Sequence, residues 1–299
     1  MNVMKMSAVR AAFLCGAAFI FAPGGVPVAA ASDAPTAQEA ARKINIAGRQ
    51  RMLSQRMAKA ACLMAQDVAA TTAFDQMTQA FNLFQKSDTA LRTGDAAMKL
   101  KPEKFPKVLN ALSAIDEHWA VYKIVIENGI ENASIKNDQL DAMDGASLRV
   151  LKFMNIAVFK TARAYAAVSA EVPLGLAITV DVAGRQRMLT QKAVKEACLM
   201  RSAKDPADHA ARLAGTVELF DTSLKALQEG FADVGVIAPP TPELARELQK
   251  VGELWAPVKK ILDRAAEGDK LSDRDLQTVA RLSEPLLRTM NKAVGMYEK

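Results

Sequence analysis

Two arginines stand at equivalent places in a heptapeptide that occurs twice in the chain. Residues 47–53 and residues 183–189 both read AGRQRML, which gives Arg51 and Arg187 the same position in each copy. A guanidinium group is planar, keeps its positive charge, and presents a fork of N–H donors that suits a flat oxyanion. Two such groups brought together could therefore hold a small anion between them.

The heptapeptide is part of a longer internal repeat with a constant offset of 136 residues. In the 20-residue window that begins at Asn45, 13 positions are identical to the window that begins at Asp181. The matches continue in the same register to about residue 158. A unit of this length exceeds the 20–50 residues of a solenoid repeat, so the pattern predicts a duplicated domain.

Each copy has the pattern of four amphipathic helices. In the first copy they are predicted at about 36–68, 73–93, 104–129 and 135–168, and in the second at about 174–203, 206–229, 242–266 and 273–297. Glycines end several of these segments, capping residues precede others, and alternating strand patterns are absent from the sequence. We therefore predict an all-α fold of two tandem four-helix up-and-down bundles, with domains at 36–168 and 174–299.

The first predicted helix carries two neighbouring stripes. One is a bundle seam that steps by four and three residues, and it contains Ile46, Gln50, Leu53, Met57, Ala60 and Met64. The other is almost entirely small, and it contains Ala47, Arg51, Ser54, Ala58, Ala61 and Ala65. Small residues let a second helix approach closely, so we expect Arg51 to lie in a tight helix–helix interface.

An arginine in such an interface needs a counter-charge, because an unpaired buried charge is costly. No acidic residue lies within one turn of Arg51, and Asp67 is four turns away. If the two first helices pair, Arg51 and Arg187 face and repel each other, and a bound anion would relieve both problems. Gly48 and Gly184, one turn earlier, would let that ligand approach the backbone. The competing interpretation is a solvated arginine whose stem lies on apolar surface.

Cysteine and histidine usage limits the chemistry that the chain can perform. Cys62 and Cys198 are repeat equivalents, and they are either two small core residues or a disulfide formed in an oxidising compartment. His118 and His209 are the only histidines and are not repeat equivalents. Neither stands in an ExxH or HExxH pattern, and no glycine-rich phosphate loop occurs. We therefore predict no metal site, no cofactor and no enzymatic activity.

The first 31 residues have the pattern of a secretory signal peptide. Lys5 and Arg10 form the positive region, residues 11–22 are apolar, and residues 28–31 offer small cleavage sites. The apolar stretch is too short to span a bilayer. We expect a periplasmic protein that does not span the membrane after cleavage. The net charge is +6, but the basic residues form no runs, so nucleic acid is not an expected partner.

The run from Asn45 to Arg56, NIAGRQRMLSQR, resembles the signature of the PilJ-type/NarX-type sensory domain. This domain is the periplasmic, N-terminal part of nitrate/nitrite sensor kinases and of type IV pilus chemotaxis transducers. The resemblance covers both copies and implies a four-helix bundle. In the NarX-type sensors, the first helices of two subunits pair, and one arginine from each binds nitrate with help from nearby glycine backbone. The matching positions here are Arg51 with Gly48 and Arg187 with Gly184.

Two hypotheses about function follow. In the first, the chain is a periplasmic ligand-binding or sensory module, and its two copies form a pseudo-dimer that binds one small oxyanion, preferably nitrate or nitrite, between Arg51 and Arg187. The active form would be a monomeric pseudo-dimer or a homodimer. In the second, the small-residue face docks a membrane sensor or a pilus or chemosensory component, without binding a small molecule. The separation of the two guanidinium groups decides whether one chain can form the complete site.

Overall fold

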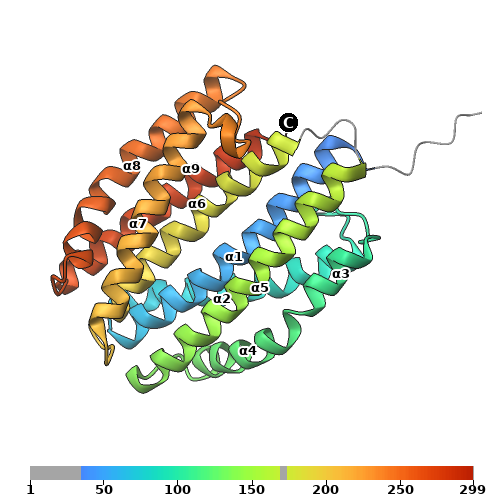
Figure 1. Cartoon of the computed structure of the whole chain (residues 1–299). Coiled ribbons are helices and arrows are strands. Elements are labelled where there is room, and N and C mark those ends of the chain that lie inside the picture. Colours follow the sequence, from blue (N-terminus) through green and yellow to red (C-terminus); the bar gives the residue numbers. More distant parts are fainter. Residues whose placement is uncertain (1–34, 169–173, 299) are drawn as a thin grey trace, which may run out of the picture. The chain divides into compact units, whose positions relative to one another are not determined.

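The computed structural model describes residues 35–168 and 174–298, and the predicted signal peptide (residues 1–31) lies outside these ranges. The first copy contains α1 (Ala37–Ala65), α2 (Ala70–Thr93), α3 (Pro106–Ser113), α4 (Asp116–Glu131) and α5 (Leu140–Val168). The second contains α6 (Leu174–Leu199), α7 (Pro206–Glu229), α8 (Pro242–Ala266) and α9 (Asp273–Met296) (Figure 1). Within the described ranges, β-structure is limited to two isolated bridges. The predicted all-α class is confirmed.

Local sequence signals fix where most of these helices begin and end. Thr36 caps α1 and Ser272 caps α9, each in a reciprocal capping box with an acidic residue three positions later. The glycines Gly94 and Gly230 end α2 and α7 with positive φ angles of 83° and 81°. At Gly94 a Cβ atom would lie 2.9 Å from the backbone oxygen of Leu100, so the tight turn there excludes other residues.

The two copies differ most in their third helix. In the second copy α8 is continuous from Pro242 to Ala266, although Pro257 lies inside it. In the first copy the predicted single helix is divided into α3 and α4, and residues 114–115 form a turn between them. The predicted start of the fourth helix was also early, because a 3-10 turn, η1 (Asn137–Gln139), precedes α5.

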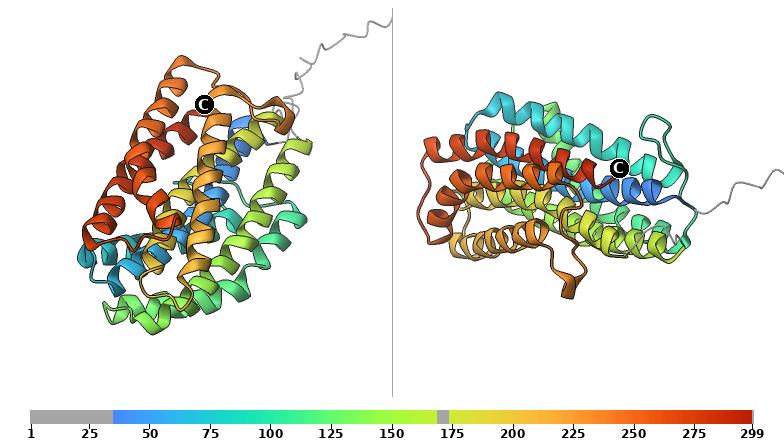
Figure 2. Two further views of the ribbon diagram at one scale, coloured as in Figure 1. Left: turned by 60° about the vertical axis from the view of Figure 1, so that its left-hand side comes forward. Right: turned by 90° about the horizontal axis from the view of Figure 1, so that it is seen from above.

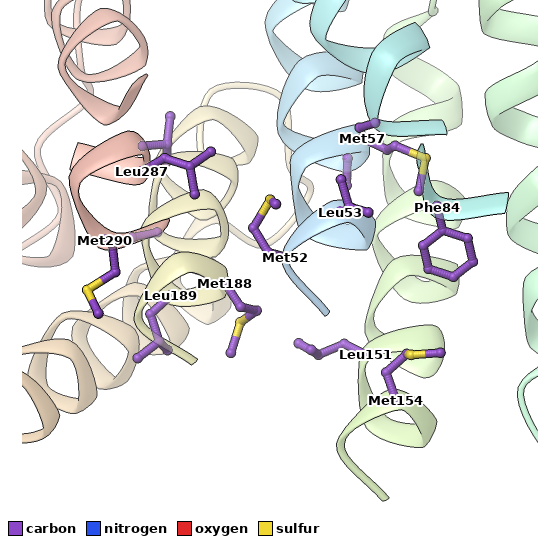
Figure 3. Packing of buried hydrophobic residues seen from close by; sticks show 14 of the residues in the cluster. Met52, Leu53, Met57, Phe84, Leu151, Met154, Met188, Leu189, Leu287 and Met290 are labelled. Carbon is purple, nitrogen blue, oxygen red and sulfur yellow. The ribbon is translucent and has the colours of Figure 1, made fainter. Parts of the chain in front are cut away.

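Each copy folds as a four-helix bundle, which confirms the predicted architecture. The first helix of each copy packs against the second and fourth helices, and the third helix completes the group. Among the described residues, α1 and α6 form the most extensive helix pair, so the two bundles meet along their first helices (Figures 1 and 2). Met52 and Met188, which are repeat equivalents, lie between the two bundles in Figure 3.

The α1–α6 interface buries the predicted small-residue stripe. Ala47 is 1% exposed, and Ala58 and Ala61 are fully buried. A disulfide bond joins Cys62 on α1 to Cys198 on α6. Small side chains therefore let the two helices approach, and a covalent bond at equivalent positions holds them together.

Candidate ligand-binding site

Arg51 and Arg187 both lie in the α1–α6 interface and are almost fully buried, with 1% and 2% of their surface exposed. A Cβ atom at Gly48 would lie 3.2 Å from Arg51 Nη2 and 3.8 Å from Arg187 Nη2. The two Nη2 atoms are therefore no farther apart than the sum of these distances, about 7 Å. A Cβ at Gly184 would meet the same two atoms at 3.2 and 3.6 Å. One chain thus brings both guanidinium groups to one place.

Groups from both copies hold the guanidinium of Arg51. Its Nε donates to the carbonyl oxygen of Gly48 at 3.5 Å, and its Nη1 donates to Asn155 Oδ1 on α5 at 3.2 Å. Its Nη2 crosses to the second copy, where it donates to the backbone carbonyl of Asp181 at 3.3 Å. These bonds leave the side chain a single direction, toward the middle of the interface.

The same three groups, one repeat later, hold Arg187. Its Nε donates to the Gly184 carbonyl at 3.4 Å, and its Nη1 donates to Asn291 Oδ1 on α9 at 3.0 Å. Its Nη2 donates to the backbone carbonyl of Asn45 in the first copy at 3.3 Å. The duplication therefore produces a site with approximate two-fold symmetry inside one chain.

One side chain on each side breaks this symmetry. Arg51 Nη2 forms an ion pair with the Asp181 carboxylate, with 2.6 Å between Nη2 and Oδ1. Arg187 Nη2 meets an amide instead, because its partner at the equivalent position is Asn45, whose Oδ1 lies 2.7 Å away. Asn45 in turn donates from Nδ2 to the carboxylate of Glu298. One arginine thus has a direct counter-charge, and the other reaches one only through an amide.

Charge and burial act on the pKa values of these groups in opposite directions. Burial lowers the pKa of Arg51, and the Asp181 carboxylate opposes that effect. Burial, together with repulsion from Arg51 and Arg49, lowers the pKa of Arg187 to about 9, so it remains a cation at neutral pH. Burial alone would raise the pKa of Asp181, but Arg51 and Arg185 hold it below its usual value.

The expectation that Arg51 lacks an internal counter-charge is wrong. Asp181 supplies one from the other copy, and a search along the first helix could not find a partner that far away in the sequence. The signal was the difference between Asn45 and Asp181 at otherwise matching positions. A second signal was the identity of Asn155 and Asn291, which occupy equivalent places on α5 and α9.

The other conspicuous arginines pair with groups away from the centre. Arg49 donates from Nη2 to Ser87 Oγ at 2.8 Å, and Arg185 pairs with Asp181 at 3.0 Å. Arg56 makes a two-pronged ion pair with Glu284 on α9, with both N–O distances at 2.8 Å. Their roles are to join helices and to neutralise local charge.

Two buried lysines reinforce the contact between the copies. Lys59 on α1 pairs with Glu284 on α9 at 3.1 Å, and its repeat equivalent Lys195 on α6 pairs with Asp144 on α5 at 2.5 Å. Both lysines are fully buried, and each reaches the fourth helix of the opposite copy. Burial lowers the pKa of Lys59 to about 8, although Glu284 opposes the shift.

The arginine pair lies close to solvent at two points. Asn155 and Asn291, which bond to the two Nη1 atoms, are themselves exposed. Asp181 also lines a cavity of about 510 Å³ between α5 and α6, together with Phe159 and Arg185. A small ligand or water at these points would be one side chain away from the guanidinium groups.

Other kinds of site find little support in the described part of the chain. Within residues 35–168 and 174–298, no cluster of three or more histidine, cysteine or acidic side chains could hold a metal ion. No helix in the same ranges is both long and apolar enough to cross a membrane. The paired arginines therefore remain the strongest candidate for a functional site.

A duplicated four-helix bundle that centres two arginines on its internal two-fold axis is the architecture of a helical sensory domain. Comparison with known proteins agrees with this class. The chain belongs to the PilJ family, whose model is described as "Type IV pili methyl-accepting chemotaxis transducer N-term" and matches residues 35–144 and 173–281, more than half of the chain. The resemblance predicted from the AGRQRML motif is thereby confirmed for both copies.

One characterised relative is the Methyl-accepting chemotaxis protein McpN of Pseudomonas aeruginosa. It is 35% identical to this chain over 119 residues, which cover 40% of this chain and 21% of the relative. The chain thus corresponds to about a fifth of the length of that chemotaxis protein. The chain is therefore a chemoreceptor-type sensory domain, duplicated in tandem.

Proposed function

We propose that this chain is a periplasmic sensory module that binds one small oxyanion, preferably nitrate or nitrite, between Arg51 and Arg187. The observation that carries the proposal is the convergence of two buried guanidinium groups within about 7 Å, beside two glycines. Like charges at this distance repel in a low-dielectric interior, and an anion between them would turn that repulsion into attraction.

The local charge favours a monovalent ligand. Two guanidinium groups face one carboxylate, that of Asp181, which leaves one net positive charge among the three side chains at the centre. A single negative charge would neutralise this set, whereas a divalent anion would reverse its sign. Nitrate and nitrite are flat, monovalent and rich in acceptor oxygens, which suits the donor geometry of arginine.

The two glycines support the same location. Gly48 and Gly184 lie on α1 and α6, where their missing side chains leave the Nη2 atoms uncovered by a Cβ. An alanine there would lie 3.2 Å from the nearer guanidinium and would occupy the space in which an oxyanion oxygen could accept its hydrogen bonds. The absence of a side chain at both positions is what an anion site between these helices requires.

The test is isothermal titration calorimetry of the mature protein with nitrate, nitrite, sulfate and chloride at low ionic strength. We expect saturable heat with nitrate or nitrite and weaker or no heat with sulfate. The Arg51→Lys/Arg187→Lys variant keeps the charge but loses the planar fork, so its affinity should fall strongly. Arg246→Lys, at an exposed arginine paired with Glu243, is the matched control and should bind like the wild type. Absence of heat with every anion, or unchanged binding in the double variant, would refute the proposal.

The periplasmic location is part of the proposal. The disulfide between Cys62 and Cys198 is consistent with an oxidising compartment outside the cytoplasm, and the predicted signal peptide (residues 1–31) indicates export. Purification of the chain from a periplasmic extract, with mass spectrometry of its N-terminus, tests this directly. An unprocessed N-terminus on cytoplasmic protein would contradict it.

The alternative function, docking to another protein, requires a different surface from the one expected. The small-residue stripe of α1 is covered by α6 within the chain, so it is not open to a partner. A docking function would therefore use an outer face of the bundles. One such face has the features of a binding groove, and it is described next.

A further inference from the structure

A groove separates α9 of the second copy from the beginning of α2 in the first. It encloses a cavity of about 700 Å³, and Figure 2 shows α9, in red, beside the start of α2, in cyan. Its lining includes the apolar residues Leu63, Ala73, Ala280 and Pro285. The groove therefore offers an apolar floor between two helices that belong to different copies.

Three arginines form a row along this groove. Arg274, Arg281 and Arg288 line the cavity and are exposed, and seven residues separate each from the next. Seven residues of an α-helix rise about 10.5 Å, so the row extends over about 21 Å. Within residues 35–168 and 174–298, no hydrogen bond or ion pair joins any of the three to a carboxylate. Glu284, which lies in the same groove, already pairs with Arg56.

The repeat supplies an internal reference for this row. The equivalent groove lies between α5 and α7, where Arg212 takes the place of Gln76. The Arg212 guanidinium pairs with Asp144 at 2.9 Å and with Asp208 at 3.0 Å, so its charge is satisfied within the chain. The row on α9 has no such internal partners in the described residues, although the two grooves descend from the same repeat.

We propose that the groove between α2 and α9 binds an acidic amphipathic helix of a partner protein. A helix with one carboxylate at every seventh residue repeats at the same distance of about 10.5 Å as the arginine row, and its small apolar residues would cover the floor. A small dicarboxylate could not reach two of the arginines at once, because the row is too widely spaced. Gln76 Oε1, buried in the wall without a hydrogen-bond partner in the described residues, would accept a bond from the bound helix.

The test uses a synthetic helical peptide of three heptads, with Glu at every seventh position and Ala and Leu on the same face. Fluorescence anisotropy measures its affinity for the full mature chain. A second peptide of the same composition, with the three Glu residues adjacent, controls for charge alone. We expect the regular peptide to bind at least about tenfold more tightly than the clustered one. Equal affinity would overturn the proposal, as would equally tight binding of inorganic polyphosphate, which would assign the row to a flexible polyanion.

Variants of the chain complete the design. Arg274→Glu/Arg281→Glu/Arg288→Glu should reduce peptide affinity at least about tenfold. The matched control is Arg149→Glu/Lys152→Glu/Lys160→Glu, which reverses three exposed cations on α5 and should keep wild-type affinity. Equal loss in both variants, or no loss in the first, would contradict the proposal. Nitrate calorimetry on the row variant should match the wild type, so this test and that of the oxyanion site can fail separately.

Discussion

The two halves of the arginine site are alike in backbone and differ in one side chain. Both arginines receive a glycine carbonyl, an asparagine from the fourth helix and a carbonyl from the opposite copy. Asp181 then gives Arg51 a carboxylate, whereas Asn45 gives Arg187 only an amide oxygen. The comparison teaches that backbone geometry sets where the guanidinium groups lie, and that residues 45 and 181 set how much charge remains for a ligand.

The largest expected effect comes from separating the two copies covalently. In Cys62→Ser/Cys198→Ser the disulfide between α1 and α6 is lost, which closes a loop of 136 residues. Chain entropy then lowers the free energy of unfolding by about 4 kcal/mol. Urea denaturation of the oxidised wild type and the variant measures this loss. A difference below about 1 kcal/mol would mean that the buried interface alone holds the copies together.

The next effect comes from making the two halves equal in amide. Asp181→Asn removes the only carboxylate in direct contact with either guanidinium, so Arg51 stays buried without a counter-charge. The free energy of unfolding should fall by about 3 kcal/mol without ligand. Nitrate should bind more tightly than to the wild type and should restore part of the stability. Thermal denaturation with and without nitrate measures both changes, and a nitrate response no greater than that of the wild type would contradict the account.

The reciprocal change makes both halves carboxylates. Asn45→Asp gives Arg187 its own anionic partner, so the two arginines no longer carry excess charge and nitrate affinity should fall at least about 100-fold, or about 2.7 kcal/mol. Asn110→Asp, at an exposed position on α3, adds the same charge elsewhere and should leave affinity unchanged. Calorimetry compares the two variants. Retained nitrate binding in Asn45→Asp would separate the ligand from the arginine pair.

The smallest expected effect concerns the buried lysines that cross between the copies. Burial lowers the pKa of Lys59 from 10.5 to about 8, so the folded protein releases this proton more easily than the unfolded chain. Between these two values the unfolded state binds more protons, and stability should rise with pH by on the order of 1–2 kcal/mol. Urea denaturation from pH 8 to 9.5 measures the rise. Lys59→Met should flatten it, and an unchanged slope in that variant would assign the effect to other groups.

Most of the fold could be predicted because its signals are local. The caps at Thr36 and Ser272 and the glycines at 94 and 230 act on neighbouring backbone, and the apolar period identifies the buried face of each helix. The division of the third helix at residues 114–115 has no such signal, since neither proline nor glycine occurs there. Pro257, which would suggest a break, lies inside the continuous α8.

The site could be predicted only in part, for the same physical reason. The repeat alone identifies Arg51 and Arg187, because their equivalence is a property of the sequence. Asp181 and Asn45 act across the interface, so their roles depend on how α1 and α6 pack against each other. A pairwise contact between copies leaves a trace in one sequence only as a difference between otherwise matching positions.

The stoichiometry of nitrate binding tests the central claim most directly. We expect calorimetry of the mature wild-type chain to give one nitrate per chain, and light scattering on the same sample to give a monomer, since both arginines already meet within one molecule. One nitrate per two chains would place the site between chains. No binding at all would show that Asp181 is the only anion that the arginine pair holds.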